Sequence, residues 1–204
     1  MMGGSPSGML SFAWGHLITH ALLTAVSMTL AAHAIAGEIE NGAMELVLAQ
    51  PISRVRYLSA HLLFGIGAIA LVAPAGIVGS IVGQDVFHVN AFPFDRNARL
   101  LLNILLLQSA IYGVTLLASS FGREAGQVAI VGVLIAVVSY LIDAVGNLWS
   151  KAAFIPPYSP HHYYEPHNIL VDGTLRPIVV IVLAAFALLT ITTAFARFGS
   201  RDLP

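Results

Sequence analysis

Long apolar stretches without a charged residue divide the chain into blocks. Five stretches contain no Asp, Glu, Lys or Arg: residues 1–37, 57–84, 100–122, 125–142 and 177–196. A charged side chain at the bilayer centre costs about 2.5–3.5 kcal/mol even on the mildest scale, and about 20 helical residues cross the hydrocarbon core. The pattern therefore predicts five membrane-spanning helices, at about residues 11–36, 57–83, 100–121, 126–149 and 177–197.

Composition supports this interpretation. Hydrophobic residues make up 57% of the 204 residues and charged residues only 9%, with a mean hydropathy of +0.84, whereas soluble domains carry about 25% charged residues. We therefore expect a single all-α membrane domain over residues 1–204. A net charge of −1 leaves no basic surface for nucleic acid, and the absence of cysteine excludes disulfides and thiolate metal sites.

The segment between the first two predicted spans has a different pattern. Asn41-Gly42 is a turn signal, and residues 43–50 then allow about two helical turns with Met44, Val47 and Leu48 on one face. Proline follows at position 51, and Ser53 can cap the next helix. This order predicts a short amphipathic helix at the membrane surface.

The same segment carries a family resemblance. It combines acidic residues, a glycine, Glu-Leu and Pro-Ile-Ser-Arg, and resembles the cytoplasmic coupling segment in the membrane subunit of ABC transporters of the type 2 exporter superfamily. The matching residues are Glu38, Glu40, Gly42, Glu45, Leu46, Leu48, Pro51, Ile52, Ser53 and Arg54. The tail, with Arg201-Asp202-Leu203, is similar to the end of the family's last span.

The resemblance implies a function and partners. It implies a permease that forms the substrate path of an ATP-driven exporter, with a second permease copy or a sister permease and a separate ATP-binding subunit. The coupling helix would dock on that subunit through the matching residues together with Met44 and Val47. Alternating access would follow, driven by ATP.

The topology is also an expectation from the resemblance. The family has six spans with a cytoplasmic N-terminus, and this chain matches spans two to six. Five spans with a cytoplasmic coupling segment place the N-terminus outside and the C-terminus in the cytoplasm, in a bacterial-type inner membrane. Lys and Arg divide five to four between the two sides, which does not orient the chain.

ATP chemistry is expected on the partner. No Gly-x-x-x-x-Gly-Lys-Ser/Thr motif is present, and the single lysine is Lys151 in a loop. We therefore expect no catalytic residue and no cofactor in this chain, with ATP and Mg on the ATP-binding subunit.

Polar residues recur at helical spacing on the third predicted span. They form one stripe in a Leu-rich segment: Gln108, Tyr112, Thr115 and Ser119. A polar face within lipid must face protein or a water-filled path. The stripe either lines a substrate route or bonds to a neighbouring helix, and the sequence favours neither.

Histidines suggest a second, weaker hypothesis. The proline-rich loop between the last two spans contains four candidate ligands for Zn or Cu: His161, His162, Glu165 and His167. Its tyrosines equally suit an interfacial aromatic belt, and we expect no stoichiometric metal. On the first span, His16 and His20 more simply make polar contacts between helices than bind a metal.

Two other function classes remain open from the sequence. One is a structural subunit of a larger membrane complex that transports nothing. The other is a metal- or haem-binding membrane protein. The sequence does not specify a transported substrate.

Overall fold

The computed structural model describes residues 12–88 and 92–202. Within these ranges all regular secondary structure is helical. Five helical segments are long and apolar enough to cross a membrane: Thr19–Glu40, Arg54–Val86, Phe94–Ser119, Ala125–Leu148 and Pro177–Ser200. The prediction of an all-α protein with five spans is thus confirmed.

The first span changes its helical register near its end. It consists of α2 (Leu17–Ala32), a π-helical turn η1 (His33–Gly37) and the short α3 (Glu38–Glu40). The Ser119 hydroxyl donates to the Ala32 carbonyl at 2.9 Å and accepts from the Ala36 N–H at 3.0 Å. These two bonds satisfy backbone groups where the π turn interrupts the regular ladder. The helix therefore continues four residues beyond the sequence-predicted end at 36.

The corner between the first two spans follows its turn and cap residues. Gly42 adopts a left-handed φ of 72° and leads into α4 (Ala43–Leu48), which is followed by α5 (Arg54–Val86). Ser53 caps α5, since its Oγ accepts from the Arg56 backbone N–H at 3.2 Å. The turn and the cap expected from sequence are both present.

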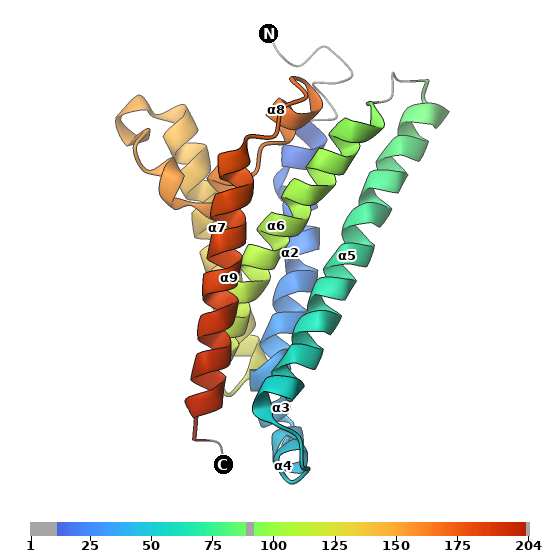
Figure 1. The fold of residues 1–204 in the computed structure, drawn as a ribbon. Helices are drawn as coiled ribbons and strands as arrows, with labels where there is room; N and C mark the ends of the chain where they lie inside the picture. The colour runs from blue at the N-terminus through green and yellow to red at the C-terminus, as the bar shows by residue number, and fades with distance from the viewer. Residues whose placement is uncertain (1–11, 89–91, 203–204) are drawn as a thin grey trace.

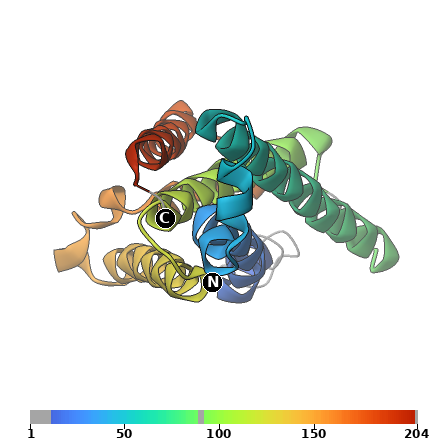
Figure 2. The ribbon, with the colours of Figure 1, turned by 90° about the horizontal axis from the view of Figure 1, so that it is seen from below.

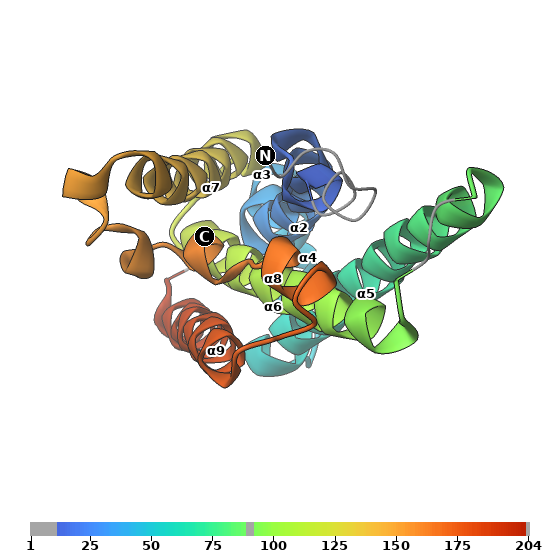
Figure 3. The same ribbon diagram turned by 90° about the horizontal axis from the view of Figure 1, so that it is seen from above.

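Helix α6 (Phe94–Ser119) forms the centre of the bundle. It contacts α2, α5, α7 (Ala125–Leu148) and α9 (Pro177–Ser200), as the view in Figure 3 shows. In its most apolar window 61% of the residues are buried, compared with 22% for α5 and 17% for α7. Helices α5 and α7 therefore leave most of their apolar surface to lipid or to other subunits.

The connection from α7 to α9 folds over one end of the bundle. It contains four short helices: η2 (Ser150–Ala152), η3 (Pro156–Tyr158), η4 (Pro160–Tyr163) and α8 (Pro166–Leu170). Asn103 of α6 holds it from both sides, because its Nδ2 donates to the Tyr163 carbonyl at 2.8 Å and its Oδ1 accepts from the Glu165 N–H at 3.0 Å. We call this end, with residues 149–176, the loop end.

The opposite end carries α3, α4, the start of α5 and the end of α9 (Figure 1). We call it the α4 end. Charged residues mark both ends: α5 begins at Arg54, and α6 begins with Asp95, Arg96 and Arg99 in its first two turns. Helices thus extend past the charge-free stretches, because charged side chains at helix ends can reach the interface.

Candidate coupling site at the α4 end

Helix α4 extends beyond the bundle (Figure 1), and its two faces differ in exposure. Met44 is only 3% exposed and belongs to the same core cluster as Leu58, with Ile39 and Tyr57 packed against it. Its side chain is therefore used within the chain and is not free to contact a partner. Burial of a Met side chain contributes about 1.5–3 kcal/mol, so Met44 anchors α4 to the bundle.

The outer face of α4 is open. Leu46 is 71% exposed, Glu45 is exposed and Val47 is half-buried, while the side chain of Leu48 lies outside what the structure describes. Leu46 is therefore an apolar side chain of α4 that is not used within the chain. Of the Met44, Val47 and Leu48 face expected from helical periodicity, Met44 is therefore turned into the core, while Leu46 and Glu45 are open to a partner.

Arg54 joins this corner to the end of α9. Its Nη1 donates to the carbonyls of Phe198 at 3.1 Å, Gly199 at 3.3 Å and Arg201 at 2.5 Å, and its guanidinium lies 5.9 Å from the centre of the Phe198 ring. Carbonyls in the last turn of a helix lack intrahelical partners and carry the negative end of the dipole. Arg54 thus closes the end of α9, and Figure 2 shows the two helices side by side at this end.

Arg201 continues the link from α9 to α6. It is only 7% exposed, and its Nη1 donates to the carbonyl of Ser120, the C-cap of α6, at 3.0 Å. Burial lowers the pKa of this guanidinium, as do the nearby positive charges of Arg123 and, next, Arg197. Arg197 itself lies over the Phe121 ring at 5.0 Å. The arginine of the Arg-Asp-Leu tail therefore caps the C-terminal end of α6, as Arg54 caps that of α9.

Glu40 provides the third link, to α7. Its Oε2 accepts from the Ala125 N–H at 2.8 Å, at the start of a helix whose own N-cap, Glu124, makes no side-chain cap bond. A carboxylate in this position satisfies an unpaired N–H and opposes the positive end of the dipole. Of the remaining motif residues, Glu38 is half-buried and Pro51 is exposed.

The contacts at this end give a structural role to residues that were identified in the sequence only by their match to the family motif. The resemblance singled out Glu40, Arg54 and the tail arginine, yet it gave no partner for any of them. Their partners are backbone groups 81 to 147 residues away in sequence. The sequence does show two arginines next to the ends of apolar helices. It does not show which helix end each arginine bonds to.

The polar stripe of α6 mostly joins helices. Gln108 accepts from Ser27 Oγ at 2.9 Å, Tyr112 donates to the His61 carbonyl at 3.0 Å, and Ser119 holds the π turn as described above. Thr115 bonds to a carbonyl of its own helix, and it also lines a groove between α6, α7 and α9. Within the described residues the stripe is buried.

The candidate metal ligands of the loop have separate partners. His161 bonds to Ser139 at 2.8 Å, His162 to Asp143 at 3.1 Å, and Glu165 pairs with Arg176 through both carboxylate oxygens. His167 is exposed in α8. Among residues 12–88 and 92–202, no three His, Cys, Asp or Glu side chains gather as a metal site.

Comparison with known proteins supplies a family. No curated protein and no solved structure matches the chain. Residues 5–203 match the family described as ABC-2 family transporter protein, which covers nearly the whole chain, including both arginine motifs. Five apolar spans, a short helix between the first two and this match lead to one conclusion: the chain belongs to the ABC-2 family of transporter membrane proteins.

Proposed function

We propose that this chain is the permease subunit of an ATP-driven exporter, coupled through α4 to a separate ATP-binding subunit. A second copy of the chain, or a sister permease, would complete the path. ATP and Mg would be bound by the partner, and the work of this chain is conformational. Membership of the family supports this proposal.

The observation that carries the proposal is the contact of Arg54 with the end of α9. Helix α4 is anchored by Met44 and is followed by Arg54, whose Nη1 lies within hydrogen-bond distance of three carbonyls in the last turn of α9 and just after it. A push on α4 is therefore passed to α9, and through Arg201 to α6. Glu40 passes the same motion to α7.

The proposal places the α4 end in the cytoplasm and the loop end outside. The chain has no cysteine, so single cysteines can be introduced without background. Lys151→Cys at the loop end should react with an impermeant thiol reagent added to intact cells, and Gln50→Cys at the α4 end should react only after permeabilisation. The reverse labelling would overturn the orientation.

The docking surface is tested by two substitutions on α4. Leu46→Asp removes an exposed apolar side chain whose burial in a complex would contribute about 1.5–3 kcal/mol, so copurification of the ATP-binding subunit should fall about tenfold or more. The thermal stability of the permease should not change. Met44→Asp should instead destabilise the permease itself, because Met44 is buried in its core.

Matched variants separate docking from a general effect of charge. Gln50→Asp, on an exposed residue at the end of the same segment, should leave copurification unchanged, and Glu45→Lys should weaken it. If Leu46→Asp leaves both copurification and permease-stimulated ATP hydrolysis unaltered, α4 is not a coupling helix, and a structural subunit that transports nothing becomes the better interpretation.

A further inference from the structure

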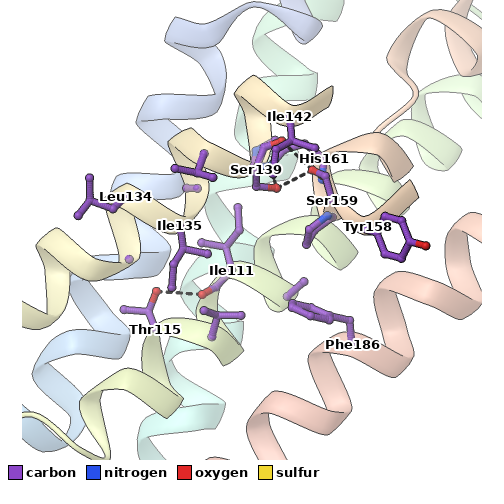
Figure 4. A pocket seen from close by; sticks show the side chains of 16 residues that line it. Ile111, Thr115, Leu134, Ile135, Ser139, Ile142, Tyr158, Ser159, His161 and Phe186 are labelled. Atoms are coloured by element: carbon purple, nitrogen blue, oxygen red, sulfur yellow. Dashed lines mark hydrogen bonds between the residues drawn. The ribbon is translucent and has the colours of Figure 1, made fainter. Parts of the chain in front are cut away.

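A groove that runs along the bundle to the loop has no role in the coupling described above. It lies between α6, α7 and α9 and has a volume of about 400 Å³ (Figure 4). Its walls are mostly aliphatic and aromatic, and none of its lining residues is charged; they include Ile111, Leu134, Ile135, Ile142 and Phe186. Ligand sites of this size in proteins are commonly apolar with a few polar groups.

Three polar residues gather at one end of the groove, whereas Thr115 lies farther along it. Ser139 of α7 lies at that end with Ser159 and His161 of the loop (Figure 4). The two hydroxyl oxygens are 2.7 Å apart, Ser159 Oγ donates to the Ser139 carbonyl at 2.7 Å, and Ser139 Oγ lies 2.8 Å from His161 Nδ1. All three residues are less than 9% exposed.

Counting protons in this cluster gives the imidazole tautomer that forms all three hydrogen bonds. Each hydroxyl has one proton. Ser159 donates its proton to the Ser139 carbonyl, so Ser139 donates its own to Ser159 Oγ, and His161 Nδ1–H must then donate to Ser139 Oγ. This arrangement forms all three bonds, and it leaves Nε2 of His161 as an acceptor without a hydrogen bond in the described part of the chain.

A second imidazole lies beside this one. His20 of α2 is 6% exposed, and its buried Nδ1 has no hydrogen-bond partner among the described residues. The polar contact expected for His20 from the sequence is not made through Nδ1, and its ring lies edge-on, 5.5 Å from that of His161. Two smaller cavities of about 220 and 180 Å³ are lined by both rings. His161 thus stands where the groove meets these cavities.

The charge of the site restricts its ligand. Burial, with a smaller contribution from His20, lowers the pKa of His161 to about 4, so its imidazole is neutral at pH 7. With no charged residue in the lining, a phosphate or carboxylate would be buried without a counter-charge, which is costly. A pure hydrocarbon would leave the acceptor nitrogen unsatisfied.

We propose that this groove binds a neutral amphipathic molecule, with an apolar chain along α7 and a hydroxyl head that donates to Nε2 of His161. That this molecule is the transported cargo rests on the proposed function; that it binds does not. The two other candidate occupants are the acyl chain of an ordinary phospholipid and a helix of a second permease copy. The acyl chain presents no hydroxyl donor to the polar end, and a second copy is distinguished by the cross-linking test below.

The test uses the full-length permease, without its ATP-binding subunit, in phosphatidylcholine nanodiscs. The probe is hexadecanol with a photoreactive diazirine in its chain, and labelled positions are read by mass spectrometry. We expect labelling on α7 and α6 beside the groove. Unlabelled hexadecanol should compete about threefold to tenfold better than hexadecyl phosphate, as one hydrogen bond predicts.

Variants of the groove provide matched controls. Ile135→Trp fills the groove and should abolish the labelling, whereas Ile130→Trp, on an exposed residue of α7 that does not line the groove, should not. His161→Phe removes the hydrogen-bond acceptor and should weaken the binding of hexadecanol about threefold to tenfold. His161→Gln keeps an acceptor and should retain most of the binding. Ile135 is 43% exposed, so its variant tests the site even where the His161 variants fold poorly.

Three results would overturn the proposal. Equal competition by hexadecanol and hexadecyl phosphate would show an ordinary lipid contact, and unchanged labelling of Ile135→Trp would place the probe elsewhere. Spontaneous cross-linking of Ile135→Cys between two permeases would show that a second copy fills the groove. Because no ATP-binding subunit is present, each of these results leaves the α4 docking test unaffected.

Discussion

Removing the Arg54 side chain should loosen the end of α9 before it affects any other helix. Arg54→Met keeps the length and apolar stem of the side chain but loses the donors to Phe198, Gly199 and Arg201. One Nη1 has two protons, so at most two of these carbonyls are well bonded at once. A hydrogen bond from a charged donor contributes about 1.5–3 kcal/mol. Arg54 is half-buried, so solvent screening weakens these bonds. We therefore assign about 1.5–3 kcal/mol to all of the Arg54 hydrogen bonds together.

Hydrogen exchange measures this loss directly. A loss of about 1.5–3 kcal/mol corresponds to about a 10- to 150-fold decrease in protection, which should appear in peptides that cover the last turn of α9. Arg54→Lys retains the charge but not the planar donor geometry, so the protection of the last turn of α9 should lie between that of Arg54→Met and that of the native protein.

The control is Arg56→Met, two residues further along the same helix on an exposed side chain. It changes the net charge by the same amount without touching α9, and we expect no change in protection there. If Arg56→Met loosens the end of α9 as much as Arg54→Met does, the effect is one of overall charge. The mechanical link from α4 to α9 would then be refuted.

Three further predictions concern other contacts. Glu40→Ala should lower the stability of the purified permease by about 0.5–2 kcal/mol, because α7 loses its cap; thermal unfolding in detergent, with exposed Glu45→Ala as the control, measures this. Gly113→Ala should destabilise the permease by about 1–3 kcal/mol, because the added β-carbon would lie 2.3 Å from a side chain of α9. Gly67→Ala is the control and should leave the stability unchanged, because its added β-carbon meets nothing within 4 Å. Burial lowers the pKa of His161 to about 4 in the folded protein, from a value near 6.5 in the unfolded chain. Between about pH 4 and pH 6.5 the unfolded state therefore binds more protons than the folded state. The stability of the permease is fully retained above about pH 6.5 and falls as the pH decreases towards 4. A melting temperature that does not change from pH 7.5 to pH 5, or changes equally in His161→Gln, would contradict this origin.

The number and order of the spans follow from the sequence alone. The cost of a charge in the bilayer acts on each segment separately, so charge-free stretches identify spans without reference to any other part of the chain. The same holds for the α4 corner, where Gly42 provides the turn and Ser53 the cap. These signals are local, and all of them are confirmed. Helix ends are less well determined, because α5 and α6 begin with charged residues that lie outside the charge-free stretches.

Only the tertiary structure decides which residues meet. Helical periodicity placed Met44 on a docking face, but its side chain is buried in the core cluster that includes Leu58, and Leu46 is left exposed. Arg54 and the end of α9 are 144 or more residues apart, and the packing of several helices brings them together. His20 and His161 become neighbours for the same reason. Hydropathy is a property of single segments, whereas contacts depend on how whole helices pack, and that information is distributed over the entire chain.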